Sequence, residues 1–275
     1  MITKGYVDTS HGQVHFRMSQ TSEPVSAPLV FFHMTADTSE SFENVMTELA
    51  GRVTTVAFDT PNYGESFRTD REPTIEFISG IMLEALDQLG FERFHTFGHH
   101  TGASIALELV HRHPERALSA TLNGMVAVTE AEGLGYLDSL VWPNPPSTQG
   151  AQIMAAWTRA LTLEPHYLDF PAEIKNRVVH TMLKSGEDWS WAYRAVFTDD
   201  AMAKLVSATR PLFFLIGKFD ASLDVHLRSH SLVPSSRSHV DDTFGMFYCE
   251  NSPADVAERV LPFLIEAEEV GDGQA

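Results

Sequence analysis

Residues 97–103 read Phe-Gly-His-His-Thr-Gly-Ala, so one imidazole, that of His100, has a glycine two residues away on each side. Small residues at these positions are what a tight strand-to-helix turn requires when its central residue points into a pocket. A histidine side chain can take up and return a proton near neutral pH. The segment therefore predicts a general base at a turn, followed by a helix that begins near Thr101.

A carboxylate that could orient this imidazole follows the most apolar run of the chain. Residues 212–216 read Leu-Phe-Phe-Leu-Ile, and Asp220 comes four residues later. Asp220 is the first candidate for this carboxylate, and its expected role follows from the resemblance described below. Asp224 is a second candidate acid, but we expect it within the next helix.

The elements that must position these residues alternate along the chain. Short, wholly apolar runs are typical of parallel strands buried on both faces, and they occur at residues 29–32, 53–58, 94–97 and 212–216. Helical stripes of apolar residues occur at 75–89, 105–110 and 256–264, and the opening residues 6–16 alternate like a hairpin. This order predicts an α/β fold with a mostly parallel, doubly wound sheet.

The middle of the chain interrupts this alternation. Residues 129–206 contain no strand-like run but hold all four tryptophans. We predict a helical cap there, inserted into a core made of residues 1–128 and 207–275. We expect Trp189 to line a pocket between cap and sheet, and the alternative is that it packs the cap onto the core.

Five segments, in this order, resemble the landmarks of the α/β-hydrolase fold superfamily. They are Phe32-His33-Met34-Thr35 (the oxyanion loop), residues 59–66, residues 97–103 (the nucleophile turn), Gly217-Lys218-Phe219-Asp220 (the triad acid) and Gly245-Met246-Phe247 (the triad histidine). The resemblance implies that Asp220 is the triad acid and that backbone N–H groups of Thr101 and of Met34 or Thr35 form an oxyanion hole. It also implies that His33 is structural and that His99 adjoins the pocket.

Two positions depart from the family pattern. His100 stands where the family places serine, cysteine or aspartate, and Met246 stands where it places the catalytic histidine. An acyl-enzyme mechanism needs a nucleophile and a base that deprotonates it, and by this alignment both are missing. The sequence therefore argues against a serine esterase and predicts that Met246 makes the pocket floor more apolar.

Two functional interpretations remain. In the first, His100 and Asp220 form a general base that acts on a small carbonyl-bearing, apolar or aromatic substrate. Hydrolysis of an ester, a lactone or an activated C–C bond by activated water ranks first, and lyase, isomerase or cofactor-free oxygenase chemistry by proton abstraction ranks next. In the second, the protein is an inactive member of the fold that binds a ligand.

Composition limits the partners. The formal net charge of -18 argues against nucleic acid and anionic membranes as partners. The single cysteine and the lack of a long apolar segment predict a cytoplasmic protein. We expect a monomer or a homodimer that binds a small-molecule substrate. No cofactor motif is present. We expect no metal site, because the adjacent His99 and His100 should diverge and His226 and His230 should lie on a solvated helix face.

Overall fold

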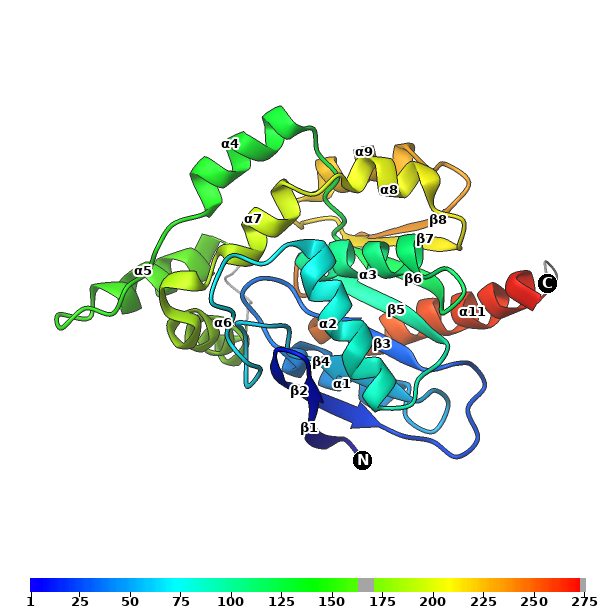
Figure 1. The fold of residues 1–275 in the computed structure, drawn as a ribbon. Coiled ribbons are helices and arrows are strands. Elements are labelled where there is room, and N and C mark those ends of the chain that lie inside the picture. Colours follow the sequence, from blue (N-terminus) through cyan, green and yellow to red (C-terminus); the bar gives the residue numbers. More distant parts are fainter. Residues whose placement is uncertain (163–170, 273–275) are drawn as a thin grey trace.

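The computed structural model describes residues 1–162 and 171–272, and its central layer is an eight-stranded sheet (Figure 1). The strand order is β1-β2-β4-β3-β5-β6-β7-β8, and only the pairs β1·β2 and β2·β4 are antiparallel. The strands are β1 (Thr3–Thr9), β2 (Gly12–Ser19), β3 (Leu29–Phe32), β4 (Thr55–Phe58), β5 (Phe94–His99), β6 (Ala117–Asn123), β7 (Leu212–Gly217) and β8 (Arg237–Asp241). The predicted mostly parallel, doubly wound sheet is confirmed.

The four apolar runs that predicted buried strands form β3, β4, β5 and β7, in which every residue is buried. The sequence did not predict two of the parallel strands, β6 and β8. Strand β6 is also wholly buried, but it alternates small, polar and apolar residues and so lacks an apolar run. Strand β8 is an edge strand with half-buried and exposed residues, and its sequence carries little hydrophobic signal.

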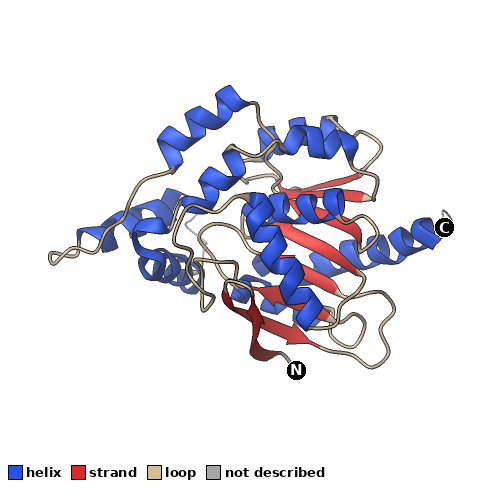
Figure 2. Cartoon of the chain, in the orientation of Figure 1, coloured by secondary structure: helices blue, strands red, loops and turns tan. Residues whose placement is uncertain are grey.

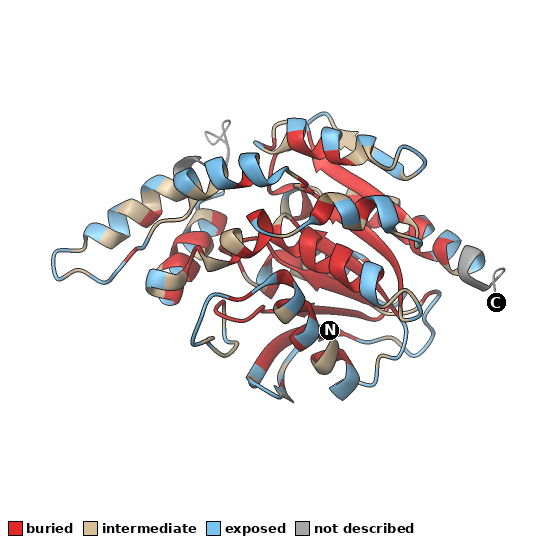
Figure 3. Ribbon diagram, turned by 45° about the horizontal axis from the view of Figure 1, so that its top comes forward, coloured by how far each residue is buried: buried red, intermediate tan, exposed pale blue. Residues whose placement is uncertain are grey.

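Helices cover both faces of the sheet, as Figure 2 shows. On one face, α2 (Ile75–Gln88) and α3 (Thr101–Arg112) pack on side chains such as Val30 and Phe32. On the other face, α1 (Glu43–Glu48), α10 (Tyr248–Asn251) and α11 (Pro253–Asp272) pack on Leu29 and Phe31. Successive strand residues face opposite sides, so both layers are built from the same short strands, and buried residues are concentrated there (Figure 3).

The segment between β6 and β7 is helical in its described part. It contains α4 (Glu130–Leu140), α5 (Ala151–Thr162), α6 (Ala172–Ser185), α7 (Trp191–Phe197) and α8 (Ala201–Ser207). Helices α4, α5 and α6 lie to one side of the sheet in Figure 1, whereas Leu205 of α8 is buried in the same cluster as α3. Among the described residues, no helix has both the length and the apolar character to cross a bilayer.

Helix α6 is tied to the core by a buried ionic cluster. The Nε atom of Arg177 donates to Asp37 Oδ1 at 2.7 Å, and its Nη2 atom donates to both Asp37 and Glu250. Burial raises the pKa of Glu250 to about 8, although Arg177 opposes that shift. Because the removal of one member of such a cluster leaves buried charge unpaired, the cluster favours one placement of α6 on the core.

Helix α9 (Leu223–Ser231) carries His226 and His230, which the sequence predicts on a solvated face, but one of them is buried. His226 is fully buried, and its Nδ1 atom accepts a hydrogen bond from the Met125 N–H at 2.9 Å. Burial lowers the pKa of His226 to about 3, so its ring is neutral at physiological pH. The expectation of a solvated face is wrong for this residue, because the i, i+4 spacing of two histidines does not show which face of the helix meets the core.

The buried, neutral His226 makes stability depend on pH. An unfolded histidine titrates near 6.5, so between pH 6.5 and about 3 the unfolded chain binds a proton that the folded chain does not. His226 therefore costs stability as the pH falls through this window, by about 1.4 kcal/mol per pH unit. A His226→Asn variant keeps an acceptor for the Met125 N–H but cannot titrate.

We expect the stability difference between wild type and His226→Asn, measured by urea unfolding at pH 8, 6 and 5, to shift in favour of the variant as the pH falls. A His11→Asn variant, which changes an exposed histidine of the β1–β2 turn, is the control and should follow the wild-type curve. Parallel curves for wild type and His226→Asn would contradict the assignment of a neutral buried ring.

Candidate active site

The turn between β5 and α3, which we call the elbow (residues 98–102), has the strained geometry that its sequence predicts. His100 has φ 49° and ψ -107°, a left-handed conformation that is rare for a residue with a side chain. A Cβ atom on Gly98 would collide with the backbone of Gly102, and one on Gly102 would collide with the backbone of Phe32. Both glycines are therefore required for α3 to approach β5 and β3 so closely.

The elbow brings His100 to Asp220, which lies just after β7. The Nε2 atom of His100 is 2.8 Å from Asp220 Oδ2, and the two side chains are 15% and 1% exposed. An ionised carboxylate only accepts hydrogen bonds, so Nε2 carries the proton of this bond. The lone pair of the neutral ring is then on Nδ1, which has no hydrogen bond to a described residue.

Asp220 is held in its ionised form. Its Oδ1 atom accepts hydrogen bonds from the N–H and the hydroxyl of Ser222, each at 2.8 Å. Burial by itself would raise the pKa of Asp220, but the His100 ring and the two Ser222 donors together lower it well below its usual range. The carboxylate therefore stays charged at any pH at which a neutral His100 could accept a proton.

The loop after β3 faces the start of α3 across the pocket. Thr35 Oγ1 and Thr101 Oγ1 are hydrogen-bonded at 2.8 Å, and the Tyr193 hydroxyl donates to the Thr35 carbonyl at 2.9 Å. Thr101 is the first residue of α3, and the N–H groups of a first helical turn have no acceptor within the helix. The loop that carries Met34 and Thr35 therefore lies against the N-terminal end of α3.

His33 supports this loop and does not line the cavity. Its Nδ1 atom donates to the Met34 carbonyl at 2.7 Å, and its Nε2 atom accepts from the Thr60 N–H at 3.0 Å. Burial lowers the pKa of His33, which agrees with a neutral ring that donates through one nitrogen and accepts through the other. The ring therefore fixes the backbone that carries Met34 and Thr35.

His99 lies behind the cavity wall. It is buried, and burial together with the neighbouring His100 lowers its pKa to about 3. Its ring centroid is 4.8 Å from that of His100, and potential ligand atoms of His99, His100 and Asp220 lie within 4.8 Å of one another. The expectation that the two adjacent histidines diverge is therefore wrong. Zinc–ligand distances of about 2.0–2.2 Å would still require the His100–Asp220 hydrogen bond to open.

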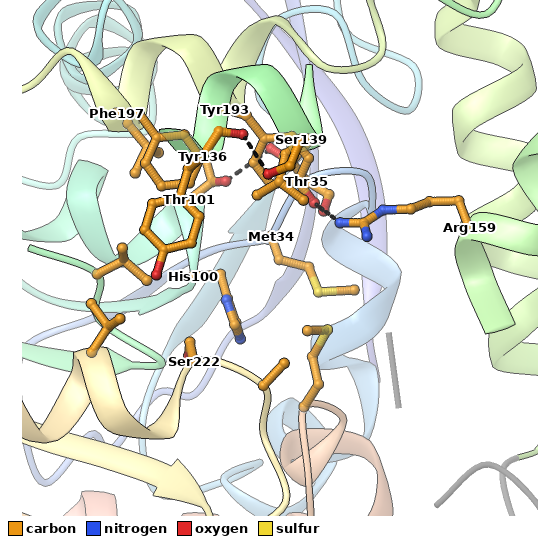
Figure 4. A pocket seen from close by; sticks show the side chains of 16 residues that line it. Met34, Thr35, His100, Thr101, Tyr136, Ser139, Arg159, Tyr193, Phe197 and Ser222 are labelled. Carbon is orange, nitrogen blue, oxygen red and sulfur yellow. Dashed lines mark hydrogen bonds between the residues drawn. The ribbon is translucent and has the colours of Figure 1, made fainter. Parts of the chain in front are cut away.

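The cavity above His100 has a volume of about 270 Å³ and is lined largely by apolar side chains (Figure 4). Met34 and Met246 form part of its wall together with Thr35 and Thr101. Tyr193 also lines it, and the remaining lining residues are Val126, Tyr136, Ser139, Leu140, Arg159, Val196, Phe197, Ala221, Ser222 and Val225. Many of them belong to α4, α5 and α7, and only the folded chain shows which faces of these helices meet the elbow.

Trp189 does not lie where one of the two sequence-based interpretations placed it, whereas Asp224 lies within the expected helix. Trp189 does not line this cavity; it is 1% exposed, its Nε1 atom donates to the Trp142 carbonyl at 2.9 Å, and its own carbonyl accepts from the Tyr63 hydroxyl at 2.8 Å. It therefore packs the inserted helices onto the core, which was the alternative interpretation. The second candidate acid, Asp224, is exposed on α9 and does not line the cavity.

Gly124, which the sequence did not single out, leaves the space that the His100 ring occupies. It follows β6, has φ +68°, and a Cβ atom there would lie 2.7 Å from both Nε2 and Cδ2 of His100. The Gly124 N–H donates to the Leu215 carbonyl at 3.1 Å, which holds this backbone against β7. The imidazole thus occupies space that any other residue at position 124 would fill.

We expect Gly124→Ala to displace the His100 ring from Asp220. The low-field proton resonance of the His100 Nε2–H, observed by NMR with labelled histidine, should be lost or move to higher field, because the charge-assisted hydrogen bond to Asp220 is broken. Gly90→Ala is the matched control, because Gly90 has a similar φ of +75° but open space around its Cβ position. An unchanged resonance in Gly124→Ala would show that the ring is not held by this contact.

Comparisons with known proteins agree with this fold. A family model described as alpha/beta hydrolase fold matches residues 27–247. Carboxylesterase nap of Bacillus subtilis (strain 168), named as uncharacterized, is 23% identical over 94% of this chain and 85% of its own length. A dihydrolipoyllysine-residue acetyltransferase component of the acetoin cleaving system of Cupriavidus necator is 32% identical over 34% of this chain. The chain spans only 25–39% of the length of the first curated relatives it matches.

Solved structures match over most of the chain. The enol-lactonase from Burkholderia xenovorans LB400 superposes with a TM-score of 0.79, covering 94% of this chain and 99% of that one at 16% identity. A variant of the N-acyl homoserine lactonase AidH, complexed with N-hexanoyl homoserine, gives a TM-score of 0.77 over 97% and 98% of the two chains at 21% identity. At these identities the likeness concerns the fold.

Proposed function

The chain belongs to the α/β-hydrolase fold family, and within that family we propose that it hydrolyses a small carbonyl compound with His100 as general base. The observation that carries this proposal is the hydrogen bond from His100 Nε2 to Asp220, 2.8 Å long, at the base of a mostly apolar cavity. In this interpretation His100 takes the place of the family nucleophile, and the thioether of Met246, which cannot carry a proton, takes the place of the family histidine.

The proposed reaction uses water directly. Nδ1 of His100 takes a proton from a water molecule as the water oxygen bonds to the substrate carbonyl carbon, and the carbonyl oxygen becomes an oxyanion. Backbone N–H groups near Thr101 and Thr35 stabilise that oxyanion, while Asp220 stabilises the imidazolium. When the C–O bond to the leaving group breaks, the same Nδ1–H protonates the departing oxygen and His100 returns to its neutral form.

The cavity limits the size and the polarity of the substrate. A volume of about 270 Å³ lies just below the usual range of small-molecule sites, roughly 300–1,000 Å³, so the substrate is small. Its largely apolar walls favour an aliphatic or aromatic body around the carbonyl group. Lactonases and a carboxylesterase are among the similar proteins, and lactones and carboxylic esters are the carbonyl compounds proposed here.

We expect His100→Ala to lower kcat/KM for activated esters and lactones by about 10²–10⁴-fold, because general-base assistance is lost. His100→Ser should be equally inactive, since no base would deprotonate the new hydroxyl. A panel of p-nitrophenyl esters and small lactones, with thermal unfolding to show that both variants fold, measures this. Equal turnover by wild type and His100→Ala would disprove the base assignment.

Removal of the orienting charge is a second test. Asp220→Asn should lower kcat by about 10²-fold or more, because an amide can hold His100 in the wrong tautomer and cannot stabilise the imidazolium. Asp224→Asn, which neutralises the exposed acid four residues later, is the control and should keep wild-type kcat. A substrate that is not hydrolysed but exchanges a C–H proton for deuterium from D₂O in a His100-dependent way would instead assign proton abstraction from carbon.

A further inference from the structure

Three potential metal ligands come together behind the cavity wall. Candidate ligand atoms of His99, His100 and Asp220 lie within 4.8 Å of one another; two of these residues belong to the elbow and the third follows β7. His100 lines the cavity, whereas His99 and Asp220 are buried, 1% and 5% exposed, and do not line it. Two imidazoles and one carboxylate form a ligand set that suits divalent first-row transition-metal ions.

His99 carries a nitrogen atom that the proposed hydrolysis does not use. Its Nε2 atom is buried and has no hydrogen-bond partner among the described residues. The ring donates a hydrogen bond to the backbone carbonyl of Met246, and because Nε2 is unpartnered, the donor is Nδ1. The lone pair of the neutral ring is therefore on Nε2. Histidines that bind metal ions commonly have this arrangement, in which one nitrogen donates to a carbonyl and the other binds the ion.

An ion shared by these residues would lie behind the His100 ring, because Nε2 of His100 faces Asp220 and neither Asp220 nor His99 lines the cavity. Ligand bonds of about 2.1 Å place two tetrahedral ligand atoms about 3.4 Å apart, so the His100 and Asp220 atoms, now 2.8 Å apart, need to separate by less than about 1 Å. A neutral imidazole has one N–H, so an ion on Nε2 shifts that hydrogen to Nδ1 without releasing a proton. Nδ1 then has no lone pair with which to take a proton from water.

We propose that His99, His100 and Asp220 form an inhibitory site for a divalent transition-metal ion, with Zn²⁺ as the ion that fits the ligand set. The bound ion holds His100 in the tautomer that cannot act as a base. The inhibition rests on the hydrolytic function proposed above, whereas the binding of the ion does not. Mg²⁺ and Ca²⁺ prefer oxygen ligands and should not occupy a site in which two of the three ligands are nitrogen.

The first test measures binding with Co²⁺, whose visible absorption reports its ligands, and with Zn²⁺ as the competitor. We expect wild type to give a Co²⁺ signal that Zn²⁺ displaces and that excess Mg²⁺ leaves in place. His99→Asn keeps a donor for the Met246 carbonyl but has no ligand at the position of Nε2. This variant should weaken binding by at least about 100-fold, since even the loss of an outer-shell partner costs about 10- to 100-fold.

Two further variants sharpen this comparison. His239→Asn is the matched control, because it removes the histidine of the other described group of candidate ligands, and it should keep the wild-type signal. Asp220→Asn removes a ligand from a different strand end and should weaken binding as His99→Asn does, which guards against a folding defect in either variant. A signal that survives both ligand substitutions, or that disappears in His239→Asn, would overturn the proposal.

A second test separates the metal site from the hydrolytic function. The low-field Nε2–H resonance of His100 should disappear as Zn²⁺ is added to wild type and return when EDTA removes the ion, without any turnover. For an ester that wild type hydrolyses, Zn²⁺ should inhibit reversibly, and His99→Asn should need at least about tenfold more Zn²⁺ for the same fractional inhibition. A resonance that persists at saturating Zn²⁺, or its loss with undiminished hydrolysis, would overturn the inhibitory site. If no ester is hydrolysed, the resonance and the Co²⁺ signal decide the site by themselves.

Discussion

The close approach of helix α3 to strands β5 and β3 is the constraint on which the rest of the site depends. Gly98 and Gly102 permit it, because a Cβ atom at either position would enter neighbouring backbone. The chain can then turn from strand to helix within one residue only if that residue takes a left-handed conformation, and His100 does so at φ 49°. The buried sheet on one side and α3 on the other maintain this strained conformation, so the position of the imidazole at the base of the cavity is fixed.

At this position the His100 ring lies beside residues from distant parts of the chain. Asp220 follows β7, Gly124 follows β6, and the loop with Thr35 follows β3, and the parallel sheet brings these three strand ends together. Each has a different physical effect on the reacting end of the cavity: Asp220 sets the tautomer, Gly124 leaves room for the ring, and Thr35 joins the β3 loop to Thr101. The proposed exchange of a serine–histidine pair for one histidine therefore needs no change in the surrounding fold.

Burial distinguishes three histidines from His100. It lowers the pKa values of His33, His99 and His226, which remain neutral parts of the framework. His100 alone among these four combines a hydrogen bond to a buried carboxylate with partial exposure to the cavity. Burial disfavours a proton on the other three rings, so among these four the position of His100 suits the proposed proton transfer.

The sequence by itself predicted the fold from local patterns, because buried parallel strands require apolar runs and the elbow requires Gly98 and Gly102. It pointed to Asp220 through the resemblance to the α/β-hydrolase fold, since the contact of Asp220 with His100 spans 120 residues of sequence. Tertiary structure alone decided the rest of the cavity. The lining faces of α4, α5 and α7, the burial of His226, the packing of Trp189 away from the cavity and the contact of Gly124 with His100 all depend on how segments far apart in the sequence pack against one another. No local pattern encodes such contacts, because their free energy comes from neighbours that are distant in the sequence and become adjacent only when the chain is folded.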